Sequence, residues 1–230
     1  MIQVKNLVKS FQNGEHRYYA VNDISFTIET GSFVVILGAS GSGKTTLLNI
    51  LSGLERPDSG NIKYSDIDIT ALSEKELVRF RRDHIGFVFQ SYYLLPALHV
   101  EANIRMGANL SNNKDISSII ASLGLAGKEK KFPYELSGGE QQRVSIARAV
   151  SKNPHVLFCD EPTGALDERT GRQIMRYLLD FQKRNNVTMI MVTHNTNLAE
   201  LADKVIHMNS GHITSMNEKS APSSLDDIAW

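Results

Sequence analysis

The sequence has a single cysteine, a single tryptophan and no long apolar run. Cys159 therefore has no partner for an internal disulfide, and its apolar neighbours in VLFCDE predict a buried structural thiol in a reducing compartment. No apolar run approaches the ~18 residues that a membrane span needs, and MIQVKNLVKSF lacks the basic and then apolar pattern of a signal peptide. We expect a cytoplasmic chain that would need a partner for any role at a membrane.

An excess of charge of either sign is also absent. Lysine and arginine together number 25, as do aspartate and glutamate, so the composition does not indicate the basic surface typical of nucleic-acid binders. What the chain does have is length and apolar content, because its 230 residues are 41% hydrophobic. The composition predicts a globular protein of one or two domains with no nucleic-acid partner.

Short strand-like runs alternate with helical patterns along most of the chain. The runs FVVIL, VLFC and TMIMV are continuously apolar, as expected for parallel strands that are covered on both faces. The run ISFTI alternates instead, which suits an antiparallel region with one face in water. This rhythm predicts an α/β fold with a mostly parallel sheet and an antiparallel β subdomain. The other strand-like runs are IQV, IGFVF and KVIHM.

Helices are expected where helical spacing lies between capping signals. Ser73 and Glu76 have the spacing of a capping box, and Gly53 is a stop signal. No strand pattern lies between Ser91 and Asn153, which predicts a helical subdomain inserted into the α/β core. The expected helices cover residues 45–52, 73–82, 100–106, 116–123, 139–152, 171–185 and 197–202; the expected domains are a core of residues 1–90 and 154–213, a helical subdomain of residues 91–153, and a polar, flexible tail of residues 214–230 with an incidental Trp230.

The stretch GASGSGKT matches the pattern G-x-x-x-x-G-K-[ST], with a predicted strand before it and a predicted helix after it. Its glycines allow the loop to turn backbone N–H groups inward, and the helix that follows adds the positive end of its dipole. Lys44 would reach the β- and γ-phosphates, and Thr45 would offer its hydroxyl to Mg²⁺. The loop predicts binding of a nucleoside triphosphate, but not whether the phosphate is hydrolysed, transferred or sensed.

Two carboxylates follow another buried strand. In VLFCDEPTGALD, Asp160 and Glu161 stand at the carboxyl end of the strand, where open α/β sheets bind ligands. Asp160 would hold Mg²⁺ through water, and Glu161 would polarise an attacking water. His194 follows the apolar run TMIMVT and would contact a γ-phosphate from the same edge. The two carboxylates, together with a metal, favour hydrolysis.

A third motif, LSGGEQQR, opens a predicted helix with a serine and two glycines. Such a helix N-terminus is a second anion site. A chain with one phosphate loop would not need a second anion site unless that site served the nucleotide of another molecule. In the order GASGSGKT, LSGGEQQR, VLFCDE, GALD and His194, the motifs resemble the nucleotide-binding subunit of ATP-binding-cassette (ABC) transporters over residues 1–213. In that family, two subunits pair head to tail around two ATP molecules.

The resemblance implies further roles. Phe11 lies where the family has an aromatic residue that stacks on adenine, with Tyr18 or Tyr19 as alternatives. Gln90 would touch Mg²⁺ and link the core to the helical subdomain. Gly164 replaces a serine that many members carry before ALD, a change that should leave catalysis intact.

The resemblance also implies how the remaining residues divide the work. Ser137 and Gly139 would meet the γ-phosphate across the dimer, Asp167 would couple the two sites, Glu161 would be the general base and His194 would hold its geometry. The implied catalytic residues are Lys44, Gln90, Glu161 and His194; the implied metal ligands are Thr45, Gln90 and Asp160; and the implied nucleotide-binding residues are Phe11, Gly38, Ala39, Ser40, Gly41, Ser42, Gly43, Lys44, Thr45, Thr46, Ser137, Gly138, Gly139 and Asp167.

Three longer segments, ASGSGKTTLLNILSGLERPDSG, QSYYLLPALHVEANI and DEPTGALD, look most like the macrolide-exporter, lipoprotein-releasing and antimicrobial-peptide-resistance group. The resemblance implies a magnesium-dependent ATPase that pairs with a second copy of itself. It would drive an integral membrane permease from the cytoplasmic face of the plasma membrane, with a periplasmic or extracellular adaptor as a further partner.

The sequence leaves several alternatives open. Residues 90–105, with SYYLLPALH, could dock a permease helix or form ordinary subdomain core. The complex could be a sensor or cell-division coupler that exports nothing. A soluble cassette ATPase would share the motifs, although such proteins usually have a coiled-coil insertion or two cassettes in one chain. A phosphate-loop kinase would share only GASGSGKT, and LSGGEQQR would have no role in it.

Overall fold

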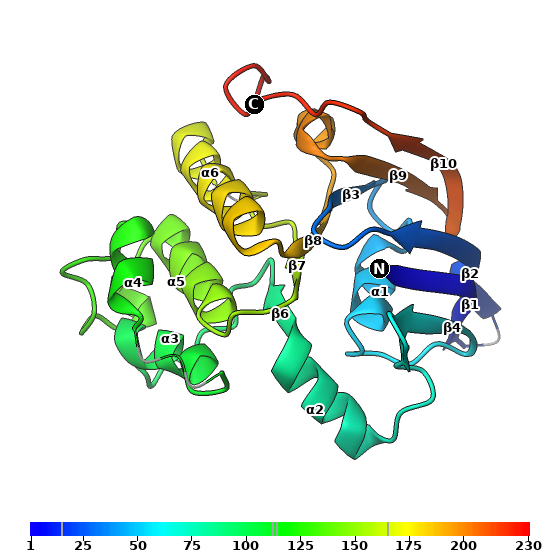
Figure 1. The fold of residues 1–230 in the computed structure, drawn as a ribbon, viewed down its shortest axis with the longest axis horizontal. Helices are drawn as coiled ribbons and strands as arrows, with labels where there is room; N and C mark the ends of the chain where they lie inside the picture. Colours follow the sequence, from blue (N-terminus) through cyan, green and yellow to red (C-terminus); the bar gives the residue numbers. More distant parts are fainter. Residues whose placement is uncertain (15, 112, 114, 165) are drawn as a thin grey trace.

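The computed structural model describes residues 1–14, 16–111, 113, 115–164 and 166–230. Its strands form two sheets (Figure 1), an antiparallel one in the order β2-β1-β4-β5 and a larger one in the order β10-β9-β3-β8-β7-β6. In the larger sheet, strands β9 to β6 of that order are parallel and β10 is antiparallel. The predicted α/β class, a mostly parallel sheet with an antiparallel β subdomain, is confirmed.

The elements follow the predicted order along the chain. The strands are β1 (Ile2–Asn13), β2 (His16–Ile28), β3 (Phe33–Leu37), β4 (Ser59–Tyr64), β5 (Ile67–Asp68), β6 (Ile85–Val88), β7 (Val156–Asp160), β8 (Thr188–Thr193), β9 (Lys204–Asn209) and β10 (His212–Glu218). The helices are α1 (Lys44–Leu51), α2 (Glu74–His84), α3 (Val100–Ala108), α4 (Ser117–Ser122), α5 (Gly138–Val150) and α6 (Glu168–Asn185), with the 3₁₀ helices η1 (Pro133–Glu135) and η2 (Thr196–Leu201).

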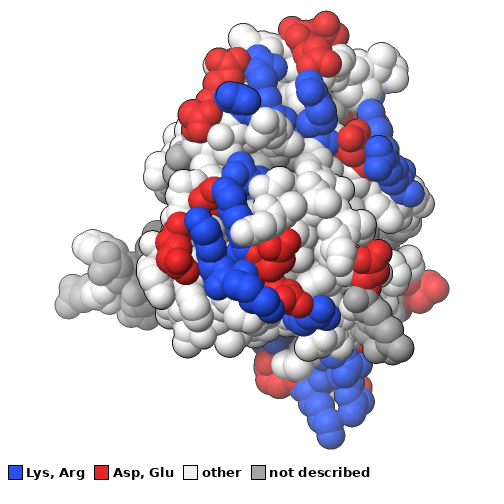
Figure 2. Space-filling model, turned by 90° about the vertical axis from the view of Figure 1, so that its left-hand side faces the viewer, with Lys and Arg blue, Asp and Glu red and all other residues white. Residues whose placement is uncertain are grey.

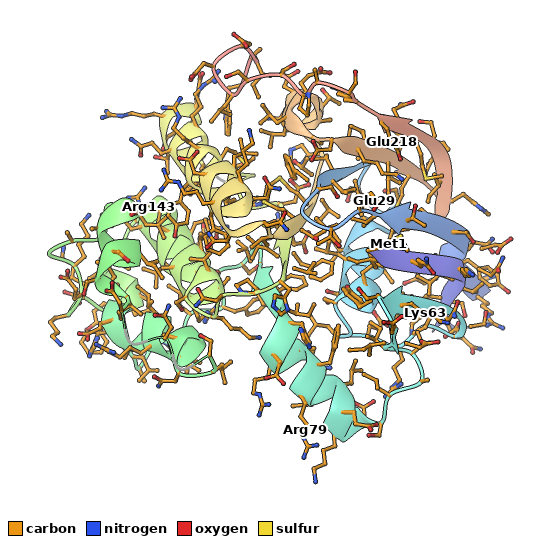
Figure 3. All side chains as sticks on the ribbon, in the orientation of Figure 1. Met1, Glu29, Lys63, Arg79, Arg143 and Glu218 are labelled. Atoms are coloured by element: carbon orange, nitrogen blue, oxygen red, sulfur yellow. The ribbon has the colours of Figure 1, made fainter. Side chains whose placement is uncertain are left out.

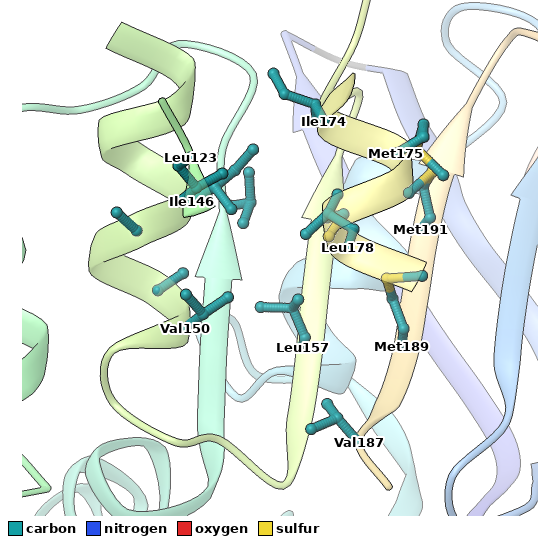
Figure 4. Packing of buried hydrophobic residues seen from close by; sticks show 14 of the residues in the cluster. Leu123, Ile146, Val150, Leu157, Ile174, Met175, Leu178, Val187, Met189 and Met191 are labelled. Carbon is teal, nitrogen blue, oxygen red and sulfur yellow. The ribbon is translucent and has the colours of Figure 1, made fainter. Parts of the chain in front are cut away.

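Residues of the central strands alternate between two hydrophobic cores. Leu157 and Met189 belong to the core beneath α5 and α6, where Figure 4 shows them beside Leu178. The next residue of each strand, Phe158 or Ile190, belongs to the core around α1. Each such side chain contributes ~1.5–3 kcal/mol when it is fully buried. This double coverage explains why β7 and β8 are continuously apolar in the sequence.

Local structure differs from the prediction at a few places. α6 begins before the predicted Gly171 because Asp167 caps its first turn, accepting a hydrogen bond from the Thr170 amide at 3.0 Å. Residues 197–202 were predicted as an α-helix, but most of this segment lies in the 3₁₀ helix η2. Strands β4, β5 and β10 were not predicted, because their sequences are short or rich in polar residues.

The helical part lies to one side of the larger sheet (Figure 1), and the described residues between Ser91 and Asn153 contain no strand. α3 and α5 approach closely, since a Cβ on Gly107 would lie 1.9 Å from the Arg148 carbonyl oxygen. Figure 2 shows lysine and arginine interspersed with aspartate and glutamate over this side of the molecule. In Figure 3, Arg79 points outward from the projecting α2. Among the described residues, no helix combines the length and apolar character needed to cross a bilayer.

Residues 214–230 do not form the polar, flexible tail that the sequence predicts. β10 extends to Glu218, and Leu225 and Ile228 are buried in the core beneath α6. Trp230, predicted to be incidental, packs against Gly171. The prediction was wrong because these few apolar residues follow no helical or strand period, although each one meets a partner that is distant in the sequence.

Candidate functional site

The register of the larger sheet brings the predicted site residues to one edge. β3 ends at Leu37 opposite Thr193 of β8, and Asp160 of β7 stands opposite Val192. β6 ends beside β7 at Val88. The loops that carry Gly38, His194, Glu161 and Gln90 therefore leave four adjacent parallel strands at the same edge, where open α/β sheets bind ligands.

The glycine loop between β3 and α1 depends on glycine at two positions. Gly43 has φ 99°, and a Cβ there would lie 1.9 Å from the Ala20 carbonyl oxygen. A Cβ on Gly38 would lie 2.4 Å from the Met208 carbonyl oxygen. The Ser42 hydroxyl is buried in the loop without a hydrogen-bond partner among the described residues. An unpartnered buried hydroxyl at a helix N-terminus fits an anion that supplies oxygen acceptors.

Lys44 places its charge at the centre of this loop. Its Nζ donates hydrogen bonds to the carbonyl oxygens of Gly38 at 2.7 Å and Ala39 at 2.9 Å, and the residue is buried. These carbonyls hold the ammonium group where phosphates cradled by the loop would meet it. α1 has no acidic residue in its first turn to compete for the charge.

Thr45 and Asp160 form a pair of oxygen ligands beside the loop. Thr45 Oγ1 donates to Asp160 Oδ1 at 3.3 Å. Burial raises the pKa of Asp160 above its ordinary value, opposed in part by the Thr45 hydrogen bond. A divalent cation would relieve that cost, and hydroxyl and carboxylate oxygens are ligands that Mg²⁺ accepts. Among the described residues, no cluster of three or more His, Cys, Asp or Glu is arranged to hold a metal.

Glu161 is held in a defined orientation. Its backbone has φ 46°, and its amide donates to the Val192 carbonyl oxygen at 3.0 Å. Its Oε1 lies 2.9 Å from His194 Nδ1, and its Oε2 accepts a hydrogen bond from Thr193 Oγ1 at 3.1 Å. The Glu161 side chain is 12% exposed and that of His194 is 68% exposed. The carboxylate is thus mostly buried beside an exposed histidine, and two groups fix its direction, a suitable arrangement for a general base.

The structure places Gln90 two residues beyond β6, exposed, at the same edge as Glu161. Phe11 lies on β1 opposite Tyr18 of β2, with ring centroids 5.7 Å apart. The hairpin that carries them continues into Ala20, whose carbonyl abuts Gly43. The aromatic pair therefore lies on the hairpin that adjoins the glycine loop.

The LSGGEQQR segment forms the N-terminus of α5. Ser137 and Glu140 make a capping box, in which Ser137 Oγ accepts from the Glu140 amide at 3.3 Å and Glu140 Oε2 accepts from the Ser137 amide at 2.8 Å. The ion pair with Lys128, followed by the Ser137 amide, lowers the pKa of Glu140 to about 2. The Ser137 hydroxyl proton remains available to a ligand, and Ser137 and Gly138 are exposed.

The N-terminus of α5 does not face the chain's own glycine loop. Figure 1 shows α5 and α1 on opposite sides of β6, β7 and β8. Asp167 follows at the start of α6, where the hydrogen bond from the Thr170 amide lowers its pKa. A Cβ on Gly139 would lie 2.9 Å from the Thr170 methyl carbon, so the first turn of α6 abuts the start of α5. Ala165, within GALD, lies outside the described residues.

Two residues of the site were not predicted from the sequence. Thr193 orients Glu161, and Gln142, which is buried, donates from Nε2 to the Pro162 carbonyl oxygen at 3.0 Å and so ties α5 to the loop after Glu161. The sequence offered a signal for Thr193, because it is a polar residue at the end of an apolar strand and next to His194. Gln142 had none, because its partner is known only once α5 is packed.

Comparisons with known proteins agree with this geometry. The sequence model of a family described as ABC transporter matches residues 21–164. An uncharacterized ABC transporter ATP-binding protein of Methanocaldococcus jannaschii, MJ0796, is 39% identical over 224 residues, which are 93% of this chain and 95% of the relative. A dimeric structure of the cassette MJ0796 bound to ADP and Pi superposes with a TM-score of 0.89 at 35% identity, covering 95% of this chain and 98% of the other.

Other relatives are longer. A putative ABC transporter ATP-binding protein of Mycoplasma pneumoniae is 43% identical over 234 residues, covering 100% of this chain but 50% of the relative. A macrolide export ATP-binding/permease protein of Azoarcus is 40% identical over 228 residues, covering 96% of this chain and 35% of the relative. The chain thus spans about half the length of the Mycoplasma relative and a smaller share of the exporter.

Proposed function

Because this chain is an ATP-binding cassette of the ABC transporter family, we propose that it hydrolyses ATP as a dimer and thereby drives a membrane permease. The observation that carries the proposal is the orientation of Glu161 by His194 and Thr193 at the strand edge that also bears the glycine loop. Nucleotide binding alone would not need a carboxylate held there.

In the proposed reaction, residues 38–46 bind the triphosphate through backbone N–H groups and Lys44. Thr45, Asp160 and Gln90 would hold Mg²⁺, which when bound supplies charge neutralisation at the β- and γ-phosphate oxygens. Glu161 accepts a proton from water as the water oxygen bonds to the γ-phosphorus. The bond from that phosphorus to the bridging oxygen breaks, and ADP leaves with the oxygen. His194 keeps the carboxylate directed at the water.

The dimer part of the proposal rests on the position of α5. Its N-terminus, where Ser137 is exposed and Gly139 half-buried, stands away from the chain's own loop and would meet the γ-phosphate held by a second copy. MJ0796 has dimeric structures. Asp167 would couple the two sites from the adjoining first turn of α6. Weaker bridging by ADP and phosphate would then let the dimer open.

Adenine stacking on Phe11 can be tested optically. We expect Phe11→Trp, made in a Trp230→Phe background, to change its emission when ATP is added, because the nucleobase would cover the new indole. Tyr19→Trp in the same background is the matched control, since Tyr19 pairs with Ser10 and points to the other face of the hairpin from Tyr18. An ATP response from Tyr19→Trp alone would move the stacking residue from Phe11 to Tyr19.

A permease dock is supported by a groove of about 410 Å³ between the core and the helical part. Its apolar wall includes Phe89, Tyr93, Met106 and Leu110. Only the first part of residues 90–105 contributes, through Tyr93, which is 63% exposed. The groove therefore extends the sequence-based candidate toward α3, and an apolar helix would fit it.

The cations of this groove indicate the charge of its occupant. Lys152 donates to the carbonyl oxygens of Arg81 and Ile85, and Arg148 donates to those of Tyr92 and Tyr93. Burial lowers the pKa of Lys152 to about 8. Carboxylates on the incoming helix would compensate these partly desolvated cations.

The finer proposals follow from the relatives. Similarity to a macrolide export protein and to a probable syringafactin export protein favours efflux or mechanical coupling for antimicrobial compounds, peptides or lipoproteins, with a periplasmic or extracellular adaptor as a further partner. The chain would then work at the cytoplasmic face of the plasma membrane. A sensor or cell-division complex and a soluble cassette ATPase are the alternatives.

The test is affinity purification of the tagged chain from detergent-solubilised membranes of its source. We expect an integral membrane protein with few spans and a large extracytoplasmic domain to co-purify. Met106→Asp in the groove should lose this partner, whereas Val78→Asp, another exposed apolar position, on α2 outside the groove, should keep it. Recovery of soluble partners or ribosomes alone would contradict the transporter proposal.

A further inference from the structure

Residues 219–230, here termed the strap, run from the end of β10 across η2 to α6. At η2, the Lys219 Nζ pairs with Glu200 Oε2 at 2.6 Å, and the Ser223 amide donates to the Glu200 carbonyl oxygen at 2.8 Å. Further along, Leu225 and Ile228 are buried in the core beneath α6. The strap lies beyond residues 21–164, which the family model matches.

Arg172 fastens the strap to α6. Its Nη1 and Nη2 donate to the carbonyl oxygens of Leu225 and Ile228, each at 2.9 Å. Its guanidinium carbon lies 5.6 Å from the centroid of the Trp230 ring, and Glu168, one turn earlier, pairs with its Nε at 2.9 Å. One side chain therefore binds two strap carbonyls and an aromatic face, which a lysine could not do at once.

Trp230 explains a glycine inside α6. A Cβ on Gly171 would lie 2.1 Å from Trp230 Cζ2, so the indole rests directly on the helix backbone. Gly171 has no positive φ that would require glycine. Glycine weakens a helix interior, and close approach of another group is a usual reason for it. The close approach of Trp230 thus accounts for glycine at position 171.

Gly171, which contacts Trp230, is next in sequence to a residue that contacts the start of α5. Thr170, next to Gly171, touches Gly139 through its methyl group, and its amide donates to Asp167. A single helical turn thus joins the indole to two residues proposed to act at the dimer interface. At its other end, the strap holds η2, which begins two residues after His194.

We propose that the strap is a positioning element for the ATP-bound dimer, with Trp230 and Arg172 setting the first turn of α6 and hence Asp167 and Gly139. This proposal rests on the proposed function. Nucleotide binding by a single chain does not depend on the strap, because the glycine loop lies against β2 and β9 instead. Loss of the strap should weaken dimer formation and leave ATP affinity of the single chain unchanged.

Trp230 is the only tryptophan, so its fluorescence reports strap docking without a label. In the full chain, we expect Gly171→Ala to shift Trp230 emission to longer wavelength and to increase its quenching by acrylamide, because the new methyl group displaces the indole. Lys183→Ala, at the exposed far end of α6, should leave both properties unchanged. Unchanged emission in a folded Gly171→Ala variant would overturn the docked strap.

The positioning role is tested in a Glu161→Gln background by sedimentation with ATP. Trp230→Ala and Gly171→Ala should each weaken ATP-dependent dimerisation roughly tenfold, within the usual range of coupling between sites. The double variant should be no weaker than Trp230→Ala alone, since both changes remove one contact. ATP affinity, measured below the concentration of dimerisation, should stay within about twofold of the parent.

The outcomes separate the two proposals. If the Glu161→Gln parent forms no ATP dimer, the proposed function is contradicted, and the positioning role falls with it. If the parent dimerises and both strap variants dimerise equally well, only the positioning role is overturned, even if their melting temperatures fall. Additive losses in the double variant would likewise contradict a shared contact between Gly171 and Trp230.

Discussion

Replacement of Glu161 by glutamine is expected to lower ATP turnover by ~10²–10⁴-fold, the usual contribution of a general base. The amide cannot accept a proton from water, but it has nearly the same shape and can still accept the Thr193 hydrogen bond. Glu161 adds negative charge beside Asp160. Its removal should also favour binding of the triphosphate, because the triphosphate is itself an anion. ATP should therefore bind and close the dimer but remain unhydrolysed.

Phosphate release and size-exclusion chromatography with ATP would measure these two properties. Glu29→Gln is the matched control, since Glu29 is an exposed carboxylate in a turn remote from the strand edge. Turnover by Glu161→Gln within a few-fold of the parent would remove Glu161 from the role of base. A loss of ATP binding together with turnover would instead indicate a structural role for the carboxylate.

Replacement of Lys44 by alanine is expected to weaken ATP binding by about 100-fold. A hydrogen bond to a charged group contributes about 1.5–3 kcal/mol, and Lys44 would make such bonds to two phosphate groups. The substitution also removes the donor that ties Gly38 and Ala39 together, so the empty loop should hold its shape less well. Both effects act on binding rather than on the chemical step.

Titration calorimetry with ATP and magnesium would measure the affinity directly. Lys63→Ala, which removes an exposed lysine from β4, controls for the change in net charge. ATP should raise the melting temperature of the parent and of Lys63→Ala, but not that of Lys44→Ala at the same concentration. Equal affinity in the parent and Lys44→Ala would contradict the assignment of the glycine loop.

Much of the candidate site could be predicted because it is built from contiguous segments. The loop at Gly38 and the cap at Ser137 need only neighbouring residues, and both the glycine φ of 99° at Gly43 and the capping box with Glu140 are local. The continuous apolar runs of β3, β7 and β8 indicated strands buried on two faces, and alternation between two cores is what the structure shows. The roles of these residues in binding and catalysis stay predictions.

Other features could not be predicted because they depend on partners far along the chain. β4 carries polar residues and a glycine, yet it pairs with β1. Gln142 has a function only because α5 packs against the Pro162 carbonyl. The strap is the clearest case. Trp230 leaves no room for a side chain at position 171, but this becomes visible only once α6 and the strap are packed together.

The sequence by itself predicted which segments would carry phosphate, metal and acid–base chemistry, because loops and helix caps are set by residues within a few positions of each other. It also predicted the α/β class, because strand-like apolar runs alternate with segments of helical spacing. Only the tertiary structure decided that β3, β8, β7 and β6 lie side by side. It alone showed that Thr193 and His194 orient Glu161, and that residues 219–230 pack against α6. Strand order and the docking of the strap depend on packing between distant segments, and local residue spacing does not encode that packing.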